Sequence, residues 1–307
     1  MATFVQQLID GLSLGSIYAL IALGYTLVYG ILRLINFAHG DLFMLAAYAA
    51  LGACAAFGLG DLSAAGIPLS SWGGFAVVLV VSMAAASVAG WLVERLAYRP
   101  LRGQPGLNLL ITAVGVSLLL ENGFQALFGD DPRRFPTLIV DRPAFSLLGA
   151  QVSTLDVTVL VTTLILLAGL ELWVHHTRTG RALRAVSLSH ETAALLGIPV
   201  DRMISLTFVV GSALAAAAAV LYGAKYPKVE PFMGVMPGLK AFVAAVLGGI
   251  GNLRGAVVGG LLLGLAETLV AAYGASGWRD ALAFGLLILV LLFKPTGLFG
   301  VHQPEKV

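Results

Sequence analysis

Residues 11–32 read "GLSLGSIYALIALGYTLVYGIL", a run without a single charged side chain. A helix needs about 20 predominantly apolar residues to cross roughly 30 Å of hydrocarbon. We therefore interpret this run as a membrane-spanning helix. The first 32 residues contain no Lys or Arg, so the charged region that opens a cleavable signal peptide is missing. We expect the segment to remain as a membrane span.

The composition places the whole chain in the same class. Of 307 residues, 59% are hydrophobic and only 11% are charged, and the mean hydropathy is +0.94. Soluble domains carry about 25% charged residues, so this chain is an integral membrane protein. Its net charge of +2 is spread without a basic block, which excludes nucleic acid as a partner. The single Cys54 excludes an intrachain disulfide framework.

Further apolar runs predict an all-α, polytopic membrane helix bundle with eight or nine transmembrane segments, built as a single domain over residues 1–307. Alternating strands of a β-barrel are excluded by these continuous runs. The break "GNLRG" at 251–255 leaves open whether 238–273 forms one span, two spans or a span with a re-entrant piece. The other expected spans are 42–60, 73–93, 106–128, 155–174, 203–223 and 281–293.

The basic residues predict the orientation. With the N-terminus outside, the inner segments hold 11 Lys and Arg residues and the outer segments hold 7. Short cytoplasmic loops are enriched in these residues, so we expect a cytoplasmic C-terminus. The loop 129–154 is then external and is expected to present an irregular face, whereas the loop 175–203 is cytoplasmic.

The loop 175–203 has helical order. Arg181, Arg184 and Leu188 follow helical spacing, and Ser189 is placed to cap a short helix over His190–Leu196. Gly197 and Pro199 would end that helix. A structured helix pair at this place is typical of a docking element.

Five glycines of the region after the break are spaced for close packing. Small residues four apart allow helices to approach closely in lipid. The pattern therefore predicts tight packing within the bundle or, alternatively, a subunit interface. These residues are Gly251, Gly255 and Gly259, and then Gly260 and Gly264.

Ionisable residues in apolar surroundings are candidates for a translocation path. Glu121 and Glu267 lie inside predicted spans, where they either line a polar path or form hydrogen bonds between helices. The stretch "NFAHGD" joins the first two spans and contains Asn36, His39 and Asp41. It is either a solvated turn with Asp41 as helix cap, or a helix break at membrane depth that lines a cavity.

Enzyme signatures are not supported by the sequence. "GGIGNLRG" lacks the Gly-Lys-Ser/Thr of a phosphate loop, and "HETAAL" has Ala194 where a zinc protease needs its second His. His175 and His176 are adjacent, which points them apart on a helix. We therefore expect no catalytic residue, no metal and no cofactor in this chain.

Four stretches in sequence order resemble the permease subunits of ABC importers for branched-chain amino acids. They are "GLSLGSIYALIALGYTLVYGILRLINFAHGDLFMLAAY" (11–48), "GRALRAVSLSHETAALLGI" (180–198), "GLKAFVAAVLGGIGNLRGAVVGGLLLGLAE" (238–267) and "FKPTGLFG" (293–300). The resemblance implies a bacterial inner-membrane protein that pairs with a second, related permease. Two cytoplasmic ATPase subunits would use the ATP, and an external binding protein would deliver the substrate.

The same resemblance gives the loop 175–203 a coupling role. ABC importers dock a short Glu-Ala-Ala…Gly helix on the ATPase, and Glu191, Thr192, Ala193 and Gly197 follow that spacing, with Thr in place of the second Ala. Arg184 and Ala194 would complete the docking surface. For "NFAHGD" the resemblance favours a helix break beside the path, with its polar residues fixing the angle of two spans.

Two other transport functions stay open from the sequence. The same architecture could carry urea, amides or another small solute. A secondary transporter could instead use protons through Glu121, Glu267 or His39. The docking-type inner loop favours the ATP-driven function, because a proton-coupled carrier does not need such a loop.

Overall fold

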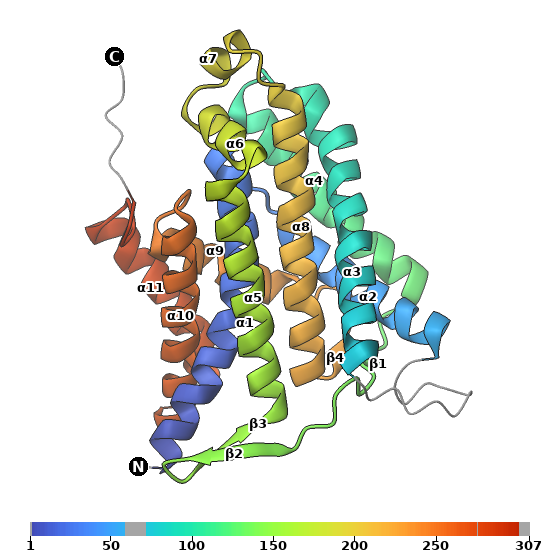
Figure 1. The fold of residues 1–307 in the computed structure, drawn as a ribbon, viewed down its shortest axis with the longest axis vertical. Helices are drawn as coiled ribbons and strands as arrows, with labels where there is room; N and C mark the ends of the chain where they lie inside the picture. The colour runs from blue at the N-terminus through green and yellow to red at the C-terminus, as the bar shows by residue number, and fades with distance from the viewer. Residues whose placement is uncertain (1, 59–71, 275, 301–307) are drawn as a thin grey trace.

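The chain folds into a helical bundle (Figure 1). The computed structural model describes residues 2–58, 72–274 and 276–300. Within these ranges, eight helices are long and apolar enough to cross a membrane, which confirms the predicted membrane bundle. They are α1 (Ala2–Leu32), α2 (His39–Phe57), α3 (Trp72–Val93) with its helical continuation to Leu101, α4 (Gly106–Phe128), α5 (Thr154–His176), α8 (Val200–Lys225), α10 (Leu253–Tyr273), and α11 (Arg279–Phe293) with the helical turn from Ser276 that precedes it.

Short helices extend or join these spans. A π-helical turn, η2 (Glu94–Tyr98), and a 3₁₀ turn, η3 (Arg99–Leu101), follow α3 directly, so that Trp72–Leu101 is one continuous helical segment. At the opposite end of the bundle from the N-terminus, α6 (Arg178–Leu188) and α7 (His190–Leu195) follow α5 (Figure 1). A 3₁₀ turn, η4 (Ser276–Trp278), precedes α11.

The region 238–273 is one span preceded by a shorter helix. Helix α9 (Val235–Gly248) has 14 residues, which is too few to cross a membrane alone, and α10 follows it. Between them, Gly249 and Gly251 have φ values of 105° and 93°, a backbone region that disfavours other residues. The break seen as "GNLRG" is thus a turn between α9 and α10 that depends on glycine.

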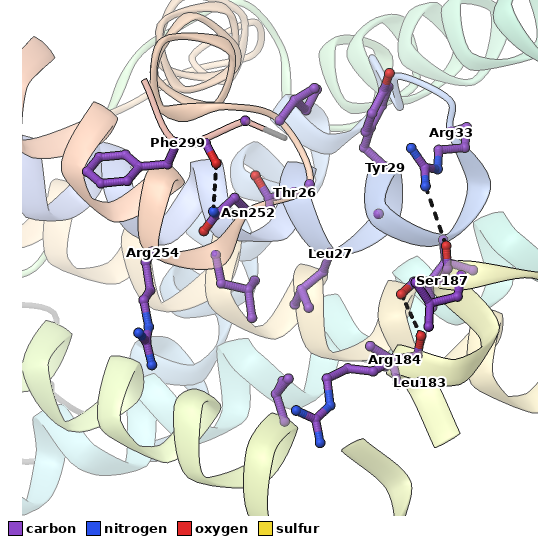
Figure 2. A pocket seen from close by; sticks show the side chains of 18 of the residues that line it. Thr26, Leu27, Tyr29, Arg33, Leu183, Arg184, Ser187, Asn252, Arg254 and Phe299 are labelled. Carbon is purple, nitrogen blue, oxygen red and sulfur yellow. Dashed lines mark hydrogen bonds between the residues drawn. The ribbon is translucent and has the colours of Figure 1, made fainter. Parts of the chain in front are cut away.

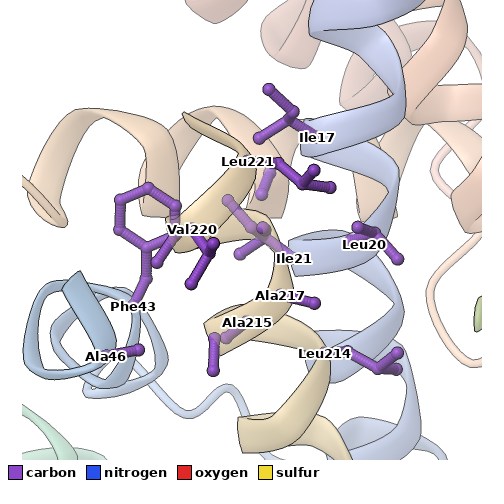
Figure 3. Packing of buried hydrophobic residues seen from close by; sticks show 14 of the residues in the cluster. Ile17, Leu20, Ile21, Phe43, Ala46, Leu214, Ala215, Ala217, Val220 and Leu221 are labelled. Carbon is purple, nitrogen blue, oxygen red and sulfur yellow. The ribbon is translucent and has the colours of Figure 1, made fainter. Parts of the chain in front are cut away.

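The centre of the bundle is α1, which α8, α9 and α10 surround. Most of its apolar stretch is buried, unlike that of the peripheral α4 and α11. Ile17 and Ile21 of α1 pack beside Ala217 and Leu221 of α8 (Figure 3). A run of alanines on α8 keeps its surface flat, so the two backbones come close. Ordinary apolar packing therefore fixes the scaffold that holds the polar sites.

The loop 129–154, which was expected to be external, is more regular than predicted. Residues 143–153 form a hairpin of β2 (Pro143–Leu147) and β3 (Ala150–Ser153), and β1 (Arg133–Arg134) pairs with β4 (Lys228–Val229), both antiparallel. Backbone pairing satisfies the polar groups that an irregular loop would leave to water. The expectation of an irregular face is wrong for these segments.

Several boundaries differ from those predicted. Helix α1 begins at Ala2 and not at residue 11, because the helix continues through Asp10, whose carboxylate lies 3.8 Å from Nζ of Lys225. Helix α2 begins three residues before the predicted start of the second span. The predicted end of that span, residues 59 and 60, lies outside the described residues.

Candidate functional site

The stretch "NFAHGD" forms a break in the helical path inside the bundle. Helix α1 ends at Leu32 and α2 begins at His39, whose ring lies directly against Gly24 of α1. Gly24 lies eight residues before the end of α1, roughly 12 Å along the helix axis. A Cβ atom on Gly40 would lie 2.7 Å from the carbonyl oxygen of Gly234, just before α9. Two helices thus begin against each other inside the bundle, so the helix break is present, whereas its membrane depth and a cavity beside it stay predictions.

Asp41 does not cap α2, which corrects the other interpretation. The residue at the cap position is Ala38, and no side chain caps this helix. Asp41 lies inside the first turn, where it accepts a 2.5 Å hydrogen bond from the Ser117 hydroxyl of α4. The Glu121 carboxyl, one turn further along α4, also interacts with Asp41. Asp41 therefore links α2 to α4.

Asn36 links the break to a different helix. Its Oδ1 accepts a 2.6 Å hydrogen bond from the Tyr98 hydroxyl in η2. His39 packs edge-on against Tyr25 with ring centroids 4.7 Å apart. Nδ2 of Asn36 and Nε2 of His39 are buried without a hydrogen-bond partner among the described residues. Burial without a hydrogen bond is costly for a polar atom, and side chains elsewhere in the bundle, such as Thr163 and Ser212, are buried in the same way.

Glu267 belongs to a buried charged cluster. Its carboxylate accepts a 2.9 Å hydrogen bond from the Tyr18 hydroxyl and one of 2.7 Å from Nζ of Lys240. Lys240 also pairs with Asp280 at 2.8 Å. The cluster joins α1, α9, α10 and α11. It has the features of a hydrogen-bonded structural pairing, and it does not meet Asp41 or Glu121.

Lys240 was not singled out from the sequence. The signal was present, because a lysine within "GLKAFVAAVL" must be paired or reach water. The same argument applies to Lys225 of α8. Its Nζ donates a 2.6 Å hydrogen bond to Oδ1 of Asp156 and a 3.0 Å hydrogen bond to Oγ of Ser13.

A further buried carboxylate lies at the end of α3. Glu94 accepts a 2.5 Å hydrogen bond from Ser205 and pairs with Arg102. Glu94 was not singled out from the sequence. Only the fold of η2 against α8 turns it inward.

Four of the five glycines pack helices within the bundle. Gly260 lies against Ala19, and Gly264 lies against Gly15, so both join α10 to α1. Gly255 lies against Gly248 and Gly259 against Ala244, so both join α10 to α9. Gly251 is different. A Cβ atom there would meet nothing within 4 Å, and its φ of 93° assigns it to the turn.

The cap predicted for the inner loop is present. Oγ of Ser189 accepts a 3.2 Å hydrogen bond from the Thr192 amide and so caps the start of α7. Gly197 has a φ of 76°, and its amide donates a hydrogen bond to the carbonyl oxygen of Ala194. The amide of Ile198 donates a hydrogen bond to the carbonyl oxygen of Ala193. This is a Schellman-like end that needs a left-handed residue. His190 ties the helix to α1, since Nε2 lies 2.9 Å from the Ile31 carbonyl oxygen.

The residues predicted for docking are divided between two surfaces. Glu191 and Ala194 are exposed on α7, while Ala193 is buried under it. Arg184 is exposed on α6 and lines a cavity of 540 Å³ (Figure 2). No ion pair joins Arg184 to Glu191 in the described ranges, so the two do not form one charged patch.

The cavity that Arg184 lines will be called the arginine crevice. It lies between the ends of α1, α5 and α6, the turn before α10, and the segment 295–300. Arg33, Arg184 and Arg254 line it (Figure 2), together with Glu171 and His175 of α5. Its walls also carry apolar side chains. The sequence could not reveal this crevice, because its residues are distributed over the whole length of the chain.

Comparison with known proteins shows which family the chain belongs to. The family described as branched-chain amino acid transport system / permease component matches residues 7–291. The chain belongs to this family. As a permease component, it is 44% identical over 307 residues to the high-affinity branched-chain amino acid transport system permease protein BraD of Pseudomonas aeruginosa. That similarity covers 99% of this chain and 98% of BraD.

Two further relatives show how far the similarity extends. The permease is 43% identical to LivH of Escherichia coli strain K12, also named as a high-affinity branched-chain amino acid transport system permease protein, over 99% of this chain and 98% of LivH. It is 25% identical to the fructose import permease protein FruG of Bifidobacterium longum, over 75% of this chain and 68% of FruG. The recognised resemblance is thus confirmed, and related chains are named for other solutes.

Proposed function

We propose that this permease forms one half of the transmembrane channel of an ATP-driven importer for branched-chain amino acids. A second, related permease completes the channel, and an external binding protein delivers the substrate. Two cytoplasmic ATPase subunits drive alternating access, so this chain carries out no covalent chemistry. The near-complete similarity to BraD and LivH supports this assignment, because it includes both the broken helices and the inner loop.

The exposed leucines around α7 are the observation that carries the ATP-driven mechanism. Leu188, Leu195 and Leu196 are 82%, 89% and 73% exposed. Helix α7 protrudes at the far end of the bundle from the N-terminus (Figure 1), beyond the end of the spanning helix α5. Leucines in that position face water unless a partner covers them. An ATPase surface is the partner that the proposed importer supplies.

The proposed orientation follows from the two ends of α1. Helix α1 starts beside the β2–β3 hairpin and ends beside α6 and α7 (Figure 1). With the docking helix in the cytoplasm, the hairpin faces outward. The chain near residue 300 lies at the cytoplasmic end, because Phe299 accepts a 2.9 Å hydrogen bond from Asn252 in the turn before α10. The C-terminus is then cytoplasmic, in a multi-pass protein of the inner membrane.

The break between α1 and α2 would lie beside the path of the substrate. Asn36, His39 and Asp41 each connect the break to a different helix, and we assign them to holding those helices at a fixed angle. Direct contact with the substrate is not their main role. Selectivity for Leu, Ile or Val can be provided by the binding protein, so a mostly apolar path of low affinity is sufficient.

ATP-dependent uptake of labelled leucine into proteoliposomes tests the proposal. The vesicles contain the permease with its second permease and ATPase subunits, and the binding protein is added. Leu195→Asp and Glu191→Arg are expected to abolish uptake and ATPase association while the two permeases still assemble. Leu148→Asp is the matched control, since Leu148 is 77% exposed at the hairpin, at the opposite end. It should keep its ATPase subunits.

The same assay separates the other two functions. Uptake that follows an imposed proton gradient and ignores ATP would contradict the proposal and assign transport to the buried carboxylates. ATP-dependent uptake of urea, an amide or a sugar without uptake of leucine would keep the mechanism but change the substrate. The similarity to a fructose import permease makes this second control necessary.

A further inference from the structure

The arginine crevice combines cationic groups with apolar walls. Arg33, Arg184 and Arg254 line it, whereas Glu171 is the one carboxylate among the described residues that line it. Leu27, Val174 and Leu253 are among the apolar side chains of the same cavity. The lining therefore has an excess of positive charge directly beside hydrocarbon-like surface. This is the combination that an amphiphilic anion requires.

The charges within the crevice are only partly compensated. Arg254 donates to Glu171 through both Nε and Nη2, at 3.2 and 2.7 Å, and is largely exposed. Arg33 donates to the Ser187 carbonyl oxygen at 3.5 Å. The Arg184 guanidinium has neither an ion pair nor a hydrogen bond to any residue that the structure describes. Figure 2 shows Arg184 extending from α6 and Arg254 from α10 toward the α5 side of the crevice.

The crevice lies at the level where a span meets the membrane surface. It is bordered by the last turn of α5, which contains Trp173 and ends at His176. Amphipathic rings at a helix end mark the interface between hydrocarbon and headgroups. A volume of 540 Å³ is in the range of sites for small ligands. Basic pockets between membrane helices on the cytoplasmic side bind the headgroups of anionic lipids.

We propose that the arginine crevice binds the phosphodiester headgroup of an anionic phospholipid from the cytoplasmic leaflet. Arg184 supplies the uncompensated charge, and Arg33 and Arg254 flank the phosphate. The acyl chains lie along the apolar wall below. The bound lipid would fasten α6 to the turn before α10. Assignment to the cytoplasmic leaflet rests on the orientation proposed above, but the site itself does not.

Native mass spectrometry of the purified importer complex tests this proposal. The complex in detergent is titrated with dioleoylphosphatidylglycerol and, separately, with dioleoylphosphatidylcholine. We expect preferential retention of phosphatidylglycerol. Arg184→Gln should weaken its retention about fivefold, the effect of one arginine near an anionic surface. Arg184→Lys should largely restore it, and phosphatidylcholine should respond to neither variant.

Arg181→Gln is the matched control, because Arg181 lies one turn earlier on α6, is exposed and does not line the crevice. Its retention of phosphatidylglycerol should equal that of the unchanged protein. An equal loss in both variants would mean attraction by general surface charge and would overturn the proposal. Retention without preference between the two lipids would do the same.

Two further results would assign the crevice to another ligand. Displacement of phosphatidylglycerol by inorganic phosphate at equal concentration would indicate a simple anion site. Retention of lipid only after removal of the ATPase subunits would show that a protein covers the crevice. Arg254→Gln provides a second variant, and size-exclusion chromatography confirms that each complex is assembled before lipid is added.

Discussion

Nζ of Lys240 lies 2.7 Å from Oε1 of Glu267, and both side chains are buried between α9 and α10. The lysine comes from the short helix and the glutamate from the full span. Asp280 of α11 pairs with the same ammonium group, at 2.8 Å. The three residues therefore hold the short helix α9, which cannot span the membrane, to two helices that do.

Replacing Glu267 with Leu should destabilise the permease by about 3 kcal/mol, because removal of one partner leaves a buried charge poorly compensated. The free energy of unfolding in a denaturing-detergent titration measures this. Lys240→Met combined with Glu267→Leu should regain much of the loss. A double variant as unstable as the sum of both single variants would contradict a direct pairing.

Asp41→Asn should retain ATP-driven uptake, since an amide oxygen can still accept the Ser117 hydrogen bond. Asp41→Leu should lose about 1–3 kcal/mol of stability, because Ser117 then loses its partner inside the protein. Uptake of labelled leucine and detergent unfolding report the two effects. Loss of uptake in Asp41→Asn with unchanged stability would show that the charge itself takes part in transport.

Gly260→Ala should separate α1 from α10 and destabilise the bundle by about 1–3 kcal/mol. The new Cβ would lie 2.6 Å from the backbone of Ala19, which cannot rotate away. Gly115→Ala on α4 is the control, since its Cβ would meet nothing within 4 Å. There the helix propensity of alanine should leave stability unchanged or raise it by up to about 1 kcal/mol. Equal effects of both substitutions would exclude close packing as the cause.

Ser189→Ala should weaken α7 by about 1 kcal/mol through loss of its cap. Faster amide hydrogen exchange over residues 190–195 and weaker ATPase association are expected, without a change in the stability of the bundle. Ser189→Asp keeps a capping oxygen and should behave like the unchanged protein. If faster exchange in Ser189→Ala left ATPase association intact, α7 would not be the docking element.

Local signals in the sequence were sufficient for the helices and for one cap. Long apolar runs predicted the spans, because hydrocarbon permits only backbone that is hydrogen-bonded within itself. Ser189 and Gly197 predicted both ends of α7, because capping involves residues only a few positions apart. The glycine spacing predicted close packing for Gly255, Gly259, Gly260 and Gly264. It failed for Gly251, whose left-handed backbone serves the turn.

Pairing across the bundle was decided only by the tertiary structure. Asp41 was interpreted as a possible cap, but the fold directs it to Ser117, 76 residues away. Lys240 and Glu267 are separated by 27 residues, and the three arginines of the crevice come from the beginning, middle and later part of the chain. The sequence by itself therefore determined that the chain lies in a membrane, its family resemblance and the short capped helix α7, since these depend on composition and short-range spacing. The partners of its buried charges depend on which helices lie side by side, and packing between distant segments decides that.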